Sequence, residues 1–301
     1  MTRALNTPSQ SPRASGTSSV GPLLIIGLVI ILVYLASVPL LNMPQAQKLL
    51  SSGADLGCAS ALECAFQLRN PTVPAPLQLL EGFRSLSWPP FASTSVPFNL
   101  LVTAGETLAG IVLASLLGIL LAVGMVSSRA LERSILPLLV ASQTIPIVAL
   151  TPMLAVTLGQ FRDLPGWVPK AIIAAYIAFF PICVGLIKGL RSPDPLQLDL
   201  MRTYNSSSAS IFFKLRFPAS LPYLFTAYKV AVAAALIGAI VAEGATVSFV
   251  GIGKMLSENS RAADSVALWV IMLYSALLGI GLVALVNLLE RIITPWKREV
   301  N

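Results

Sequence analysis

The sequence predicts an all-α integral membrane protein with six transmembrane helices. Of its 301 residues, 55% are hydrophobic and 11% are charged, whereas a soluble domain carries about a quarter charged residues. Nearly uncharged runs of about 20 residues, the length that crosses a hydrocarbon core of about 30 Å, recur six times along the chain. The connecting segments also alternate between basic and acidic character.

The predicted spans follow one another at 20–41, 99–126, 135–158, 170–190, 230–249 and 265–289. With the N-terminus in the cytoplasm, most of the 20 Lys and Arg residues lie inside and most of the 13 Asp and Glu residues lie outside. This arrangement obeys the positive-inside rule and also places the C-terminus in the cytoplasm. The net charge of +7 therefore follows from membrane topology and requires no nucleic-acid partner.

The first hydrophobic run is preceded by a polar tail and followed by a long loop. Residues 1–19 are rich in Pro and Ser and are expected to be a disordered cytoplasmic tail. Residues 20–41 exceed the usual hydrophobic core of a signal peptide and lack a clear cleavage site, so we interpret them as an uncleaved N-terminal anchor helix. Residues 42–97 are expected to form a Pro-rich external loop with one possible short helix near residues 58–67. Residues 98–290 carry the other spans, and 291–301 form a cytoplasmic tail.

The chain contains three cysteines and lacks histidine. The absence of histidine excludes histidine-dependent triads and zinc sites of the HExxH type, so we expect neither a catalytic residue nor a metal site. Cys58 and Cys64, in GCASALEC, are spaced so that they could form a disulfide if their loop faces an oxidising compartment. Two free thiols are the alternative, because spacing does not determine geometry.

A polar, basic segment interrupts the apolar chain at about 198–218. Leu198 to Tyr204 can form a short amphipathic helix that ends at Asn205, a residue that tolerates the left-handed conformation. The serines after Asn205 can cap a second helix reaching about Phe217, and Pro218 and Pro222 are expected to restrict its continuation. A basic amphipathic segment that rests on anionic lipid is one interpretation of this hairpin.

The order of residues in this hairpin resembles the cytoplasmic EAA loop of ABC importer permeases. The family pattern is Glu-Ala-Ala, three residues, Gly, nine residues, Ile, any residue, Leu-Pro. Asp199 stands at the Glu and Asn205 at the Gly, while the last three positions fall on Leu215, Phe217 and Pro218. The proline is identical, and the other substitutions keep charge, turn or apolar character. Leu200 and Met201 replace the two alanines with larger side chains.

The chain from about residue 99 onward is similar to permeases of the nitrate, sulfonate, taurine and thiamine-precursor importer family. The matching segments include GETLAGIVLASLLGILLAVGM, FFPICVGLIKGL, FPASLPYLFTAYKVAVAAALIGAIVAE, VGIGKML and LLERIITPWKR. The resemblance implies a type I ABC importer permease fold in the bacterial inner membrane. The MRTYN and IGAIVAE segments resemble permeases for pyrimidine, thiamine-precursor or riboflavin uptake, so these compounds or sulfonates are the candidate solutes.

The resemblance also implies partners and a role for the hairpin. Such a permease pairs with a second copy or a homologue, with two ATP-binding subunits that hold ATP and Mg²⁺, and with an external solute-binding protein. The hairpin would couple the permease to the ATP-binding subunit through Asp199, Arg202, Asn205, Ile211, Phe212, Leu215, Phe217 and Pro218. The chain itself would need no cofactor and would not be an enzyme.

Polar groups and prolines inside the predicted spans are candidate pathway or gate positions. Loosened backbone at membrane depth is tolerated against protein or water, which selects Gln143, Thr144 and Pro146 in the third span. Tyr176 and Phe180 in the fourth span could contact a flat solute, although ordinary helix packing also explains them. Glu243 lies deep in the fifth span, where a carboxylate is costly unless it serves a gate or a dimer contact or lies at the interface.

Two other classes of function are alternatives to the importer subunit. A stand-alone ion-coupled carrier or channel would work without an ATP-binding partner. A membrane-embedded enzyme is disfavoured by the missing histidines and by the lack of clustered carboxylates within the spans. The segment VGIGKML superficially resembles a phosphate-binding loop, but Met255 replaces the Ser or Thr that would hold Mg²⁺. We therefore expect ATP to bind to another polypeptide.

Overall fold

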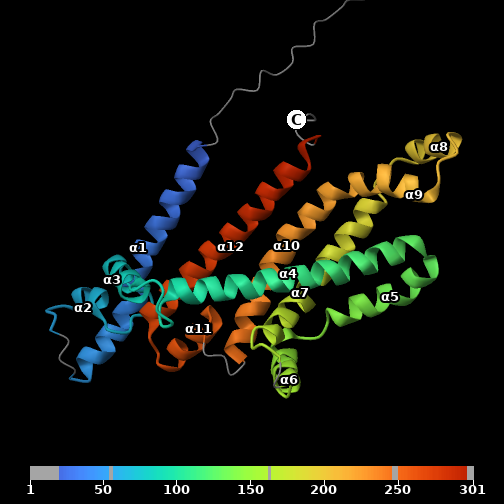
Figure 1. The fold of residues 1–301 in the computed structure, drawn as a ribbon. Coiled ribbons are helices and arrows are strands. Elements are labelled where there is room, and N and C mark those ends of the chain that lie inside the picture. Colours follow the sequence, from blue (N-terminus) through green and yellow to red (C-terminus); the bar gives the residue numbers. More distant parts are fainter. Residues whose placement is uncertain (1–19, 54–56, 162–163, 246–249, 297–301) are drawn as a thin grey trace, which may run out of the picture. The chain divides into compact units, whose positions relative to one another are not determined.

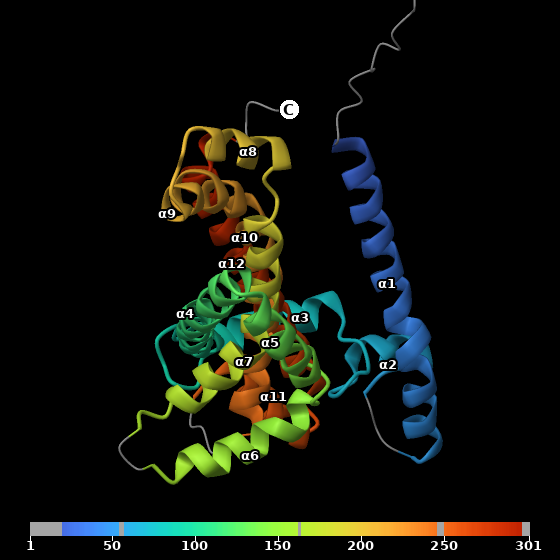
Figure 2. The ribbon, with the colours of Figure 1, turned by 90° about the vertical axis from the view of Figure 1, so that its right-hand side faces the viewer.

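A computed structural model describes residues 20–53, 57–161, 164–245 and 250–296. Every regular element in these ranges is a helix. Five helices are long and apolar enough to cross a membrane, and the bent pair α5 and α6 supplies a sixth span if it is counted as one. The predicted all-α fold with six spans is therefore supported (Figures 1 and 2). The chain divides into two compact units, Met1–Ala75 and Pro76–Asn301.

The first unit contains α1 (Val20–Ser51) and α2 (Ala61–Gln67). Helix α1 continues ten residues beyond the predicted boundary at Leu41, because Asn42 is fully buried and ties it to the following segment. The Asn42 side-chain amide donates to the carbonyls of Ala65 (3.0 Å) and Val73 (2.8 Å). The predicted tail at residues 1–19 lies outside the described residues.

Helix α2 is the short helix expected near residues 58–67. Its N-cap, Ser60, accepts a hydrogen bond from the Glu63 backbone N–H (3.2 Å), and the Glu63 carboxylate accepts one from the N–H of Ala59, the residue before the cap (3.0 Å). Cys58 and Cys64 form a disulfide with their Cα atoms 5.4 Å apart. The structure thus favours the disulfide over two free thiols.

The second unit begins with α3 (Pro76–Ser87). The sequence analysis did not predict this helix, which lies within the expected external loop. The ring of Phe83 lies 5.2 Å from that of Tyr274, and the Ser87 and Tyr274 hydroxyls are 2.6 Å apart. These contacts pack α3 onto α12 (Ser265–Ile293). Residues 42–97 therefore hold the end of α1, two further helices and the first residues of α4, and are less irregular than we expected.

The core of the second unit is built on α7 (Val168–Leu190), which packs along both α4 (Val96–Ser127) and α10 (Phe217–Ala245) (Figures 1 and 2). Its buried residues include a row of alanines at the contacts with both neighbours. A Cβ placed on Gly110 of α4 would lie 2.6 Å from that of Ala174, and one on Gly118 would lie 3.0 Å from the Phe179 carbonyl oxygen. Small residues allow this close approach, which drives helix association in lipid.

The third predicted span, residues 135–158, is not one continuous helix. Helix α5 (Arg129–Ser142) and helix α6 (Ile147–Gly159) are separated by a break and bent by 93°. Pro146 caps α6, and a proline disfavours helical conformation in the residue before it. Polar groups at this break were expected, but the sharp change in direction was not.

The prolines after the hairpin do not stop the chain from continuing as a helix, contrary to our expectation. Helix α10 begins at Phe217 and runs through Pro218 and Pro222 to Ala245. It follows a π-helical segment, η1 (Phe212–Arg216), in which Phe217 N–H bonds to the Phe212 carbonyl. Helical backbone therefore runs continuously from Ser208 through both prolines to Ala245, with the π-helical turn directly before Pro218. The last two helices are α11 (Ile252–Arg261) and α12.

Replacing Gly185 on α7 with leucine is expected to separate α7 from α10. A Cβ at Gly185 would overlap the Cβ of Ala227 on α10, and overpacking of this kind costs about 1–3 kcal/mol. The melting temperature of the purified full-length protein should fall. Gly281→Leu in α12 is the matched control, because a Cβ there meets no atom within 4 Å. Equal melting temperatures for the two variants would contradict the packing described.

Candidate functional site

The polar segment forms a helical hairpin at the ends of α7 and α10. Its first helix, α8 (Pro195–Thr203), starts at Asp194, whose carboxylate accepts a hydrogen bond from Leu196 N–H (2.8 Å). The hairpin lies at the opposite end of the second unit from α6 and α11 (Figures 1 and 2). Because the hairpin follows α7 and leads into α10, its backbone is continuous with two of the three central helices.

Asn205 makes the turn, as the sequence predicted. Its φ of 53° lies in the left-handed region. The N–H of Asn205 bonds to the Arg202 carbonyl (2.8 Å), and the N–H of Ser206 reaches back to the Met201 carbonyl (3.1 Å), which together form a Schellman motif. Ser207 then caps α9 (Ser208–Ile211) by accepting from Ser210 N–H (3.2 Å).

The side chains of the hairpin are arranged differently from the expected apolar ridge. Phe212 packs against the core formed by α4, α7 and α10, and Ile211 and Leu215 are half-buried. Phe217 is 41% exposed, and Pro218 is half-buried. The ridge expected to face a partner is thus largely turned toward its own chain.

The most exposed apolar side chains of the hairpin lie elsewhere. Leu196 and Leu200 of α8, and Tyr204 directly after it, are exposed by 77%, 57% and 77%, and Phe213 by 68%. We call these four residues the outer ridge. Leu196, Leu200 and the cap residue Tyr204 are spaced at i, i+4 and i+8, which places them on one face. This spacing was the sequence signal that could have identified them. Beside them, Arg202 pairs with Asp199 at 3.1 Å, and both side chains are exposed.

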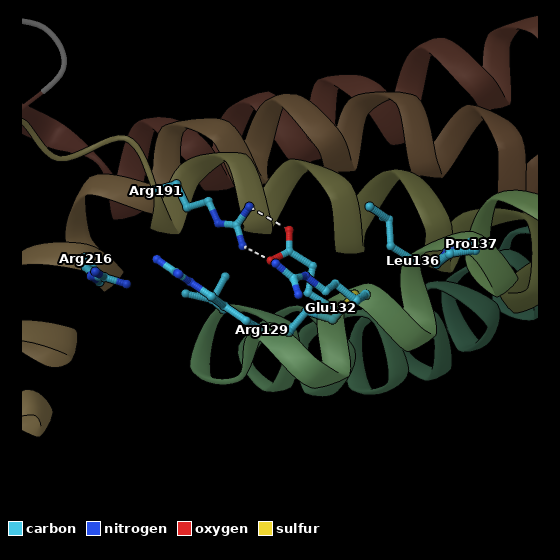
Figure 3. Close-up of a pocket in the computed structure, with 9 residues that line it drawn as sticks. Arg129, Glu132, Leu136, Pro137, Arg191 and Arg216 are labelled. Atoms are coloured by element: carbon cyan, nitrogen blue, oxygen red, sulfur yellow. Dashed lines mark hydrogen bonds and ion pairs between the residues drawn. The ribbon is translucent and has the colours of Figure 1, made fainter.

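An ion pair fixes the base of the hairpin to α5. Arg191, the residue after α7, donates from Nη1 and Nη2 to the two carboxylate oxygens of Glu132, at 2.8 and 2.7 Å (Figure 3). These hydrogen bonds raise the pKa of the Arg191 guanidinium above its ordinary value. Because the pair is bidentate, it sets direction as well as distance. The sequence analysis did not identify Glu132 as the partner of Arg191.

Glu243 lies in a second cluster at the other end of α10, and its side chain is fully buried. It accepts a hydrogen bond from the Thr103 hydroxyl of α4 (2.6 Å) and another from Gly253 N–H at the start of α11 (2.6 Å). Thr103 in turn accepts from Ile252 N–H (3.0 Å), and Asn99 accepts from Gly251 N–H (2.5 Å). The carboxylate thus joins α10, α4 and the N-terminus of α11.

Gly251 and Gly253 are required for this cluster. Gly251 has a φ of 123°, and a Cβ there would overlap the Glu243 carboxyl group. A Cβ on Gly253 would overlap the Ile240 carbonyl. Since the N–H groups of residues 251–253 are already bonded to side chains, they are not available to hold a phosphate. This agrees with our rejection of VGIGKML as a phosphate loop.

Most of the remaining candidate pathway residues lie at the break between α5 and α6 or contact it. Gln143, Thr144 and Pro146 are exposed there, and the Tyr176 hydroxyl donates to the carbonyl of Ser142, the last residue of α5. Phe180 packs against the central core. The structure therefore links Tyr176 to the break, whereas the hydrogen-bond partners of Glu243 come from α4 and α11. Within the described residues, no group of three or more Cys, Asp or Glu side chains could hold a metal ion.

Glu243→Ala is expected to lower stability markedly. The change leaves the Gly253 N–H without its acceptor and leaves the Thr103 hydroxyl only the Asn99 carbonyl at 3.1 Å, and a buried group left unsatisfied costs about 1–3 kcal/mol. Glu258→Ala is the control, because Glu258 is 58% exposed in a surface pair with Lys254, where about 1 kcal/mol or less is at stake. Thermal unfolding of the two variants measures the difference, and a loss at Glu243 no larger than at Glu258 would refute the role of the Glu243 carboxylate in joining α4, α10 and α11.

Comparison with known proteins identifies the family to which this chain belongs. Residues 114–299 match the family model described as binding-protein-dependent transport system inner membrane component. The formylaminopyrimidine transport permease protein of Halalkalibacterium halodurans is 32% identical over 75% of this chain and 86% of its own length.

Two further relatives carry different names. The riboflavin transport system permease protein of Chloroflexus aurantiacus is 31% identical over 56% of this chain, and the match spans 61% of that protein, less than two thirds of it. The nitrate import permease protein of Synechocystis sp. is 24% identical over 75% of this chain and 82% of its own length. The chain belongs to the family of binding-protein-dependent transport system inner membrane components, and it is a membrane-spanning permease subunit of an ABC importer.

Proposed function

We propose that the α8–α9 hairpin docks in a separate ATP-binding subunit and that this contact drives transport. The outer ridge is the observation that carries the proposal, because it presents four large apolar side chains from a segment that is otherwise polar. Buried aromatic and aliphatic anchors supply most of the affinity of protein interfaces. The partner would hold ATP and Mg²⁺, and this chain would contribute no ATPase residue.

Connections between the hairpin and the central helices support a mechanical role. On one side, Arg191 and Glu132 tie the end of α7 to α5 at 2.7 and 2.8 Å. On the other side, helix continues from Ser208 to Ala245, and Lys229 pairs with Glu290 of α12 at 2.6 Å. Movement of the hairpin would therefore displace α7 and α10 together, as coupling by a rigid element requires.

The proposed complex contains two ATP-binding subunits, two permease subunits that are identical or homologous, and an external solute-binding protein. Both termini of this chain would be cytoplasmic. The Cys58–Cys64 disulfide supports this orientation, because it then lies outside, where disulfides persist. Closure of the ATP-bound subunits would open the pathway outward, and hydrolysis would reset it.

We place the solute pathway along the break between α5 and α6 and the face of α7 that carries Tyr176 and Phe180. Exposed polar residues at the break and the adjacent aromatic rings support this placement. The Glu243 cluster would hold the outer ends of α4 and α10 in one gate position. Formylaminopyrimidine and riboflavin in the names of two relatives favour a small heterocycle as the solute.

Leu200→Asp tests the docking surface. A charge in the middle of the outer ridge should weaken association with the ATP-binding subunit at least about tenfold, because losing a central apolar anchor commonly costs 2 kcal/mol or more. Co-purification after co-expression with the ATP-binding subunit of the same organism measures it. Leu80→Asp on α3 is the control, since Leu80 is 67% exposed but lies outside the hairpin. Undiminished co-purification of the Leu200 variant would contradict the proposal.

The energy source and the solute can be tested together in reconstituted vesicles. The complete complex should hydrolyse ATP faster when its binding protein and the correct compound are added, and a panel of pyrimidines, flavins, sulfonates and nitrate should show its largest stimulation with a heterocycle. Stimulation by a sulfonate or nitrate alone would reject the proposed solute class. Uptake driven by an ion gradient in vesicles without ATP would reject the importer mechanism itself.

A further inference from the structure

A basic pocket lies beside the hairpin, between α5, the end of α7 and η1. Its volume is about 680 Å³. Four arginines line it: Arg129 and Arg133 from α5, Arg191 from the end of α7, and Arg216 from η1. Since these elements are far apart in the sequence, the fold itself brings the four guanidinium groups together.

The charges in this pocket do not balance. Glu132 is the one carboxylate among the lining residues, and both of its oxygens are bonded to Arg191. Across the described chain, Arg129, Arg133 and Arg216 form neither a hydrogen bond nor an ion pair with a carboxylate, so three positive charges remain without a direct counterion. Like charges that line one pocket repel one another, an anion between them relieves this repulsion, and guanidinium forks match phosphate geometry well.

The pocket also has an apolar part. Met125 and Val126 from the end of α4, and Leu136 and Pro137 from α5, complete its lining. In Figure 3 the side chains of Arg129, Arg191 and Arg216 gather toward one end of the pocket, whereas Leu136 and Pro137 lie toward the other. A ligand that fits must therefore carry an anionic group and a hydrocarbon part.

The position of the pocket relative to the spans favours one source for such a ligand. Helices α4 and α7 end at Ser127 and Leu190, so the arginines lie where two membrane-spanning helices emerge. Phospholipid headgroups occupy this level of a bilayer, and basic pockets between transmembrane helices bind anionic headgroups. A free inorganic phosphate would leave the apolar lining without a contact.

We propose that the pocket formed by Arg129, Arg133, Arg191 and Arg216 binds the phosphate of an anionic phospholipid, with an acyl chain along Val126, Leu136 and Pro137. The bound headgroup bridges α5 to η1 in addition to the Arg191–Glu132 pair. It therefore stabilises the position of the segment that connects the hairpin to α10. This consequence for coupling rests on the proposed function, but the binding site does not.

The test is lipid binding to the purified full-length chain, measured by native mass spectrometry. The two probes are phosphatidylglycerol and phosphatidylcholine with identical acyl chains. We expect the unmodified protein to bind phosphatidylglycerol roughly tenfold more tightly. Arg129→Gln/Arg133→Gln should abolish this preference, and Arg129→Lys/Arg133→Lys should keep most of it, because the charge remains. Arg191 stays unchanged, so that Glu132 keeps its partner.

Arg261→Gln/Arg291→Gln is the matched control, because it removes the same charge from α11 and α12 and should leave the preference intact. Equal loss in this control would mean that net charge alone attracts the lipid, which overturns the site. Displacement of the lipid by inorganic phosphate without hydrocarbon overturns the lipid assignment. A glutamine variant that keeps lipid binding but no longer retains the ATP-binding subunit would reassign these arginines to that interface. Failure of the Leu200→Asp test, by contrast, bears on the hairpin alone.

Discussion

The close approach of α7 to α4 and α10 is the constraint on which the rest of the second unit depends. In hydrocarbon every backbone group must be satisfied within the protein, which enforces helices, and helices gain little from the hydrophobic effect when they associate there. Close van der Waals contact between helix backbones drives their association instead. Gly110 and Gly118 on α4, and Gly185 on α7 facing α10, leave no room for a Cβ at these crossings. The helices that meet at α7 therefore move as a body, and a segment attached to their ends can act on all of them.

The hairpin is that attached segment. It leaves α7 through Arg191, which Glu132 holds, and it returns through η1, where the wider π-helical turn leads into α10 without a break. Its turn is equally well determined, since Asn205 and Ser207 satisfy the exposed backbone groups of both short helices. With its base fixed and its outer face apolar, the hairpin has the properties that a coupling element needs: a stiff connection and an anchor for a partner.

Much of this arrangement follows from local sequence. The spans are set by long apolar runs, and the left-handed turn at Asn205 follows from the tolerance of asparagine for that conformation. The sequence-based predictions that were wrong concerned features that depend on tertiary contacts. Phe212 is a large apolar residue of the kind that docks in a partner, but it packs on the core of its own chain. Leu196, Leu200 and Tyr204 are exposed instead. The partners of Glu243 lie 140 and 10 residues away, a separation that no local pattern encodes. We expected Pro218 to restrict the helix, but the π-helical turn before it leads directly into α10.

The most direct test of the central claim places a photoreactive amino acid at Tyr204 in the assembled, membrane-embedded complex. Tyr204 is the most exposed aromatic residue of the outer ridge. Irradiation should cross-link it to the ATP-binding subunit, whereas the same group at Phe91, which is 78% exposed but precedes α4 on the proposed external side, should not. Cross-links from position 204 to lipid alone, with the ATP-binding subunit present and active, would contradict the account.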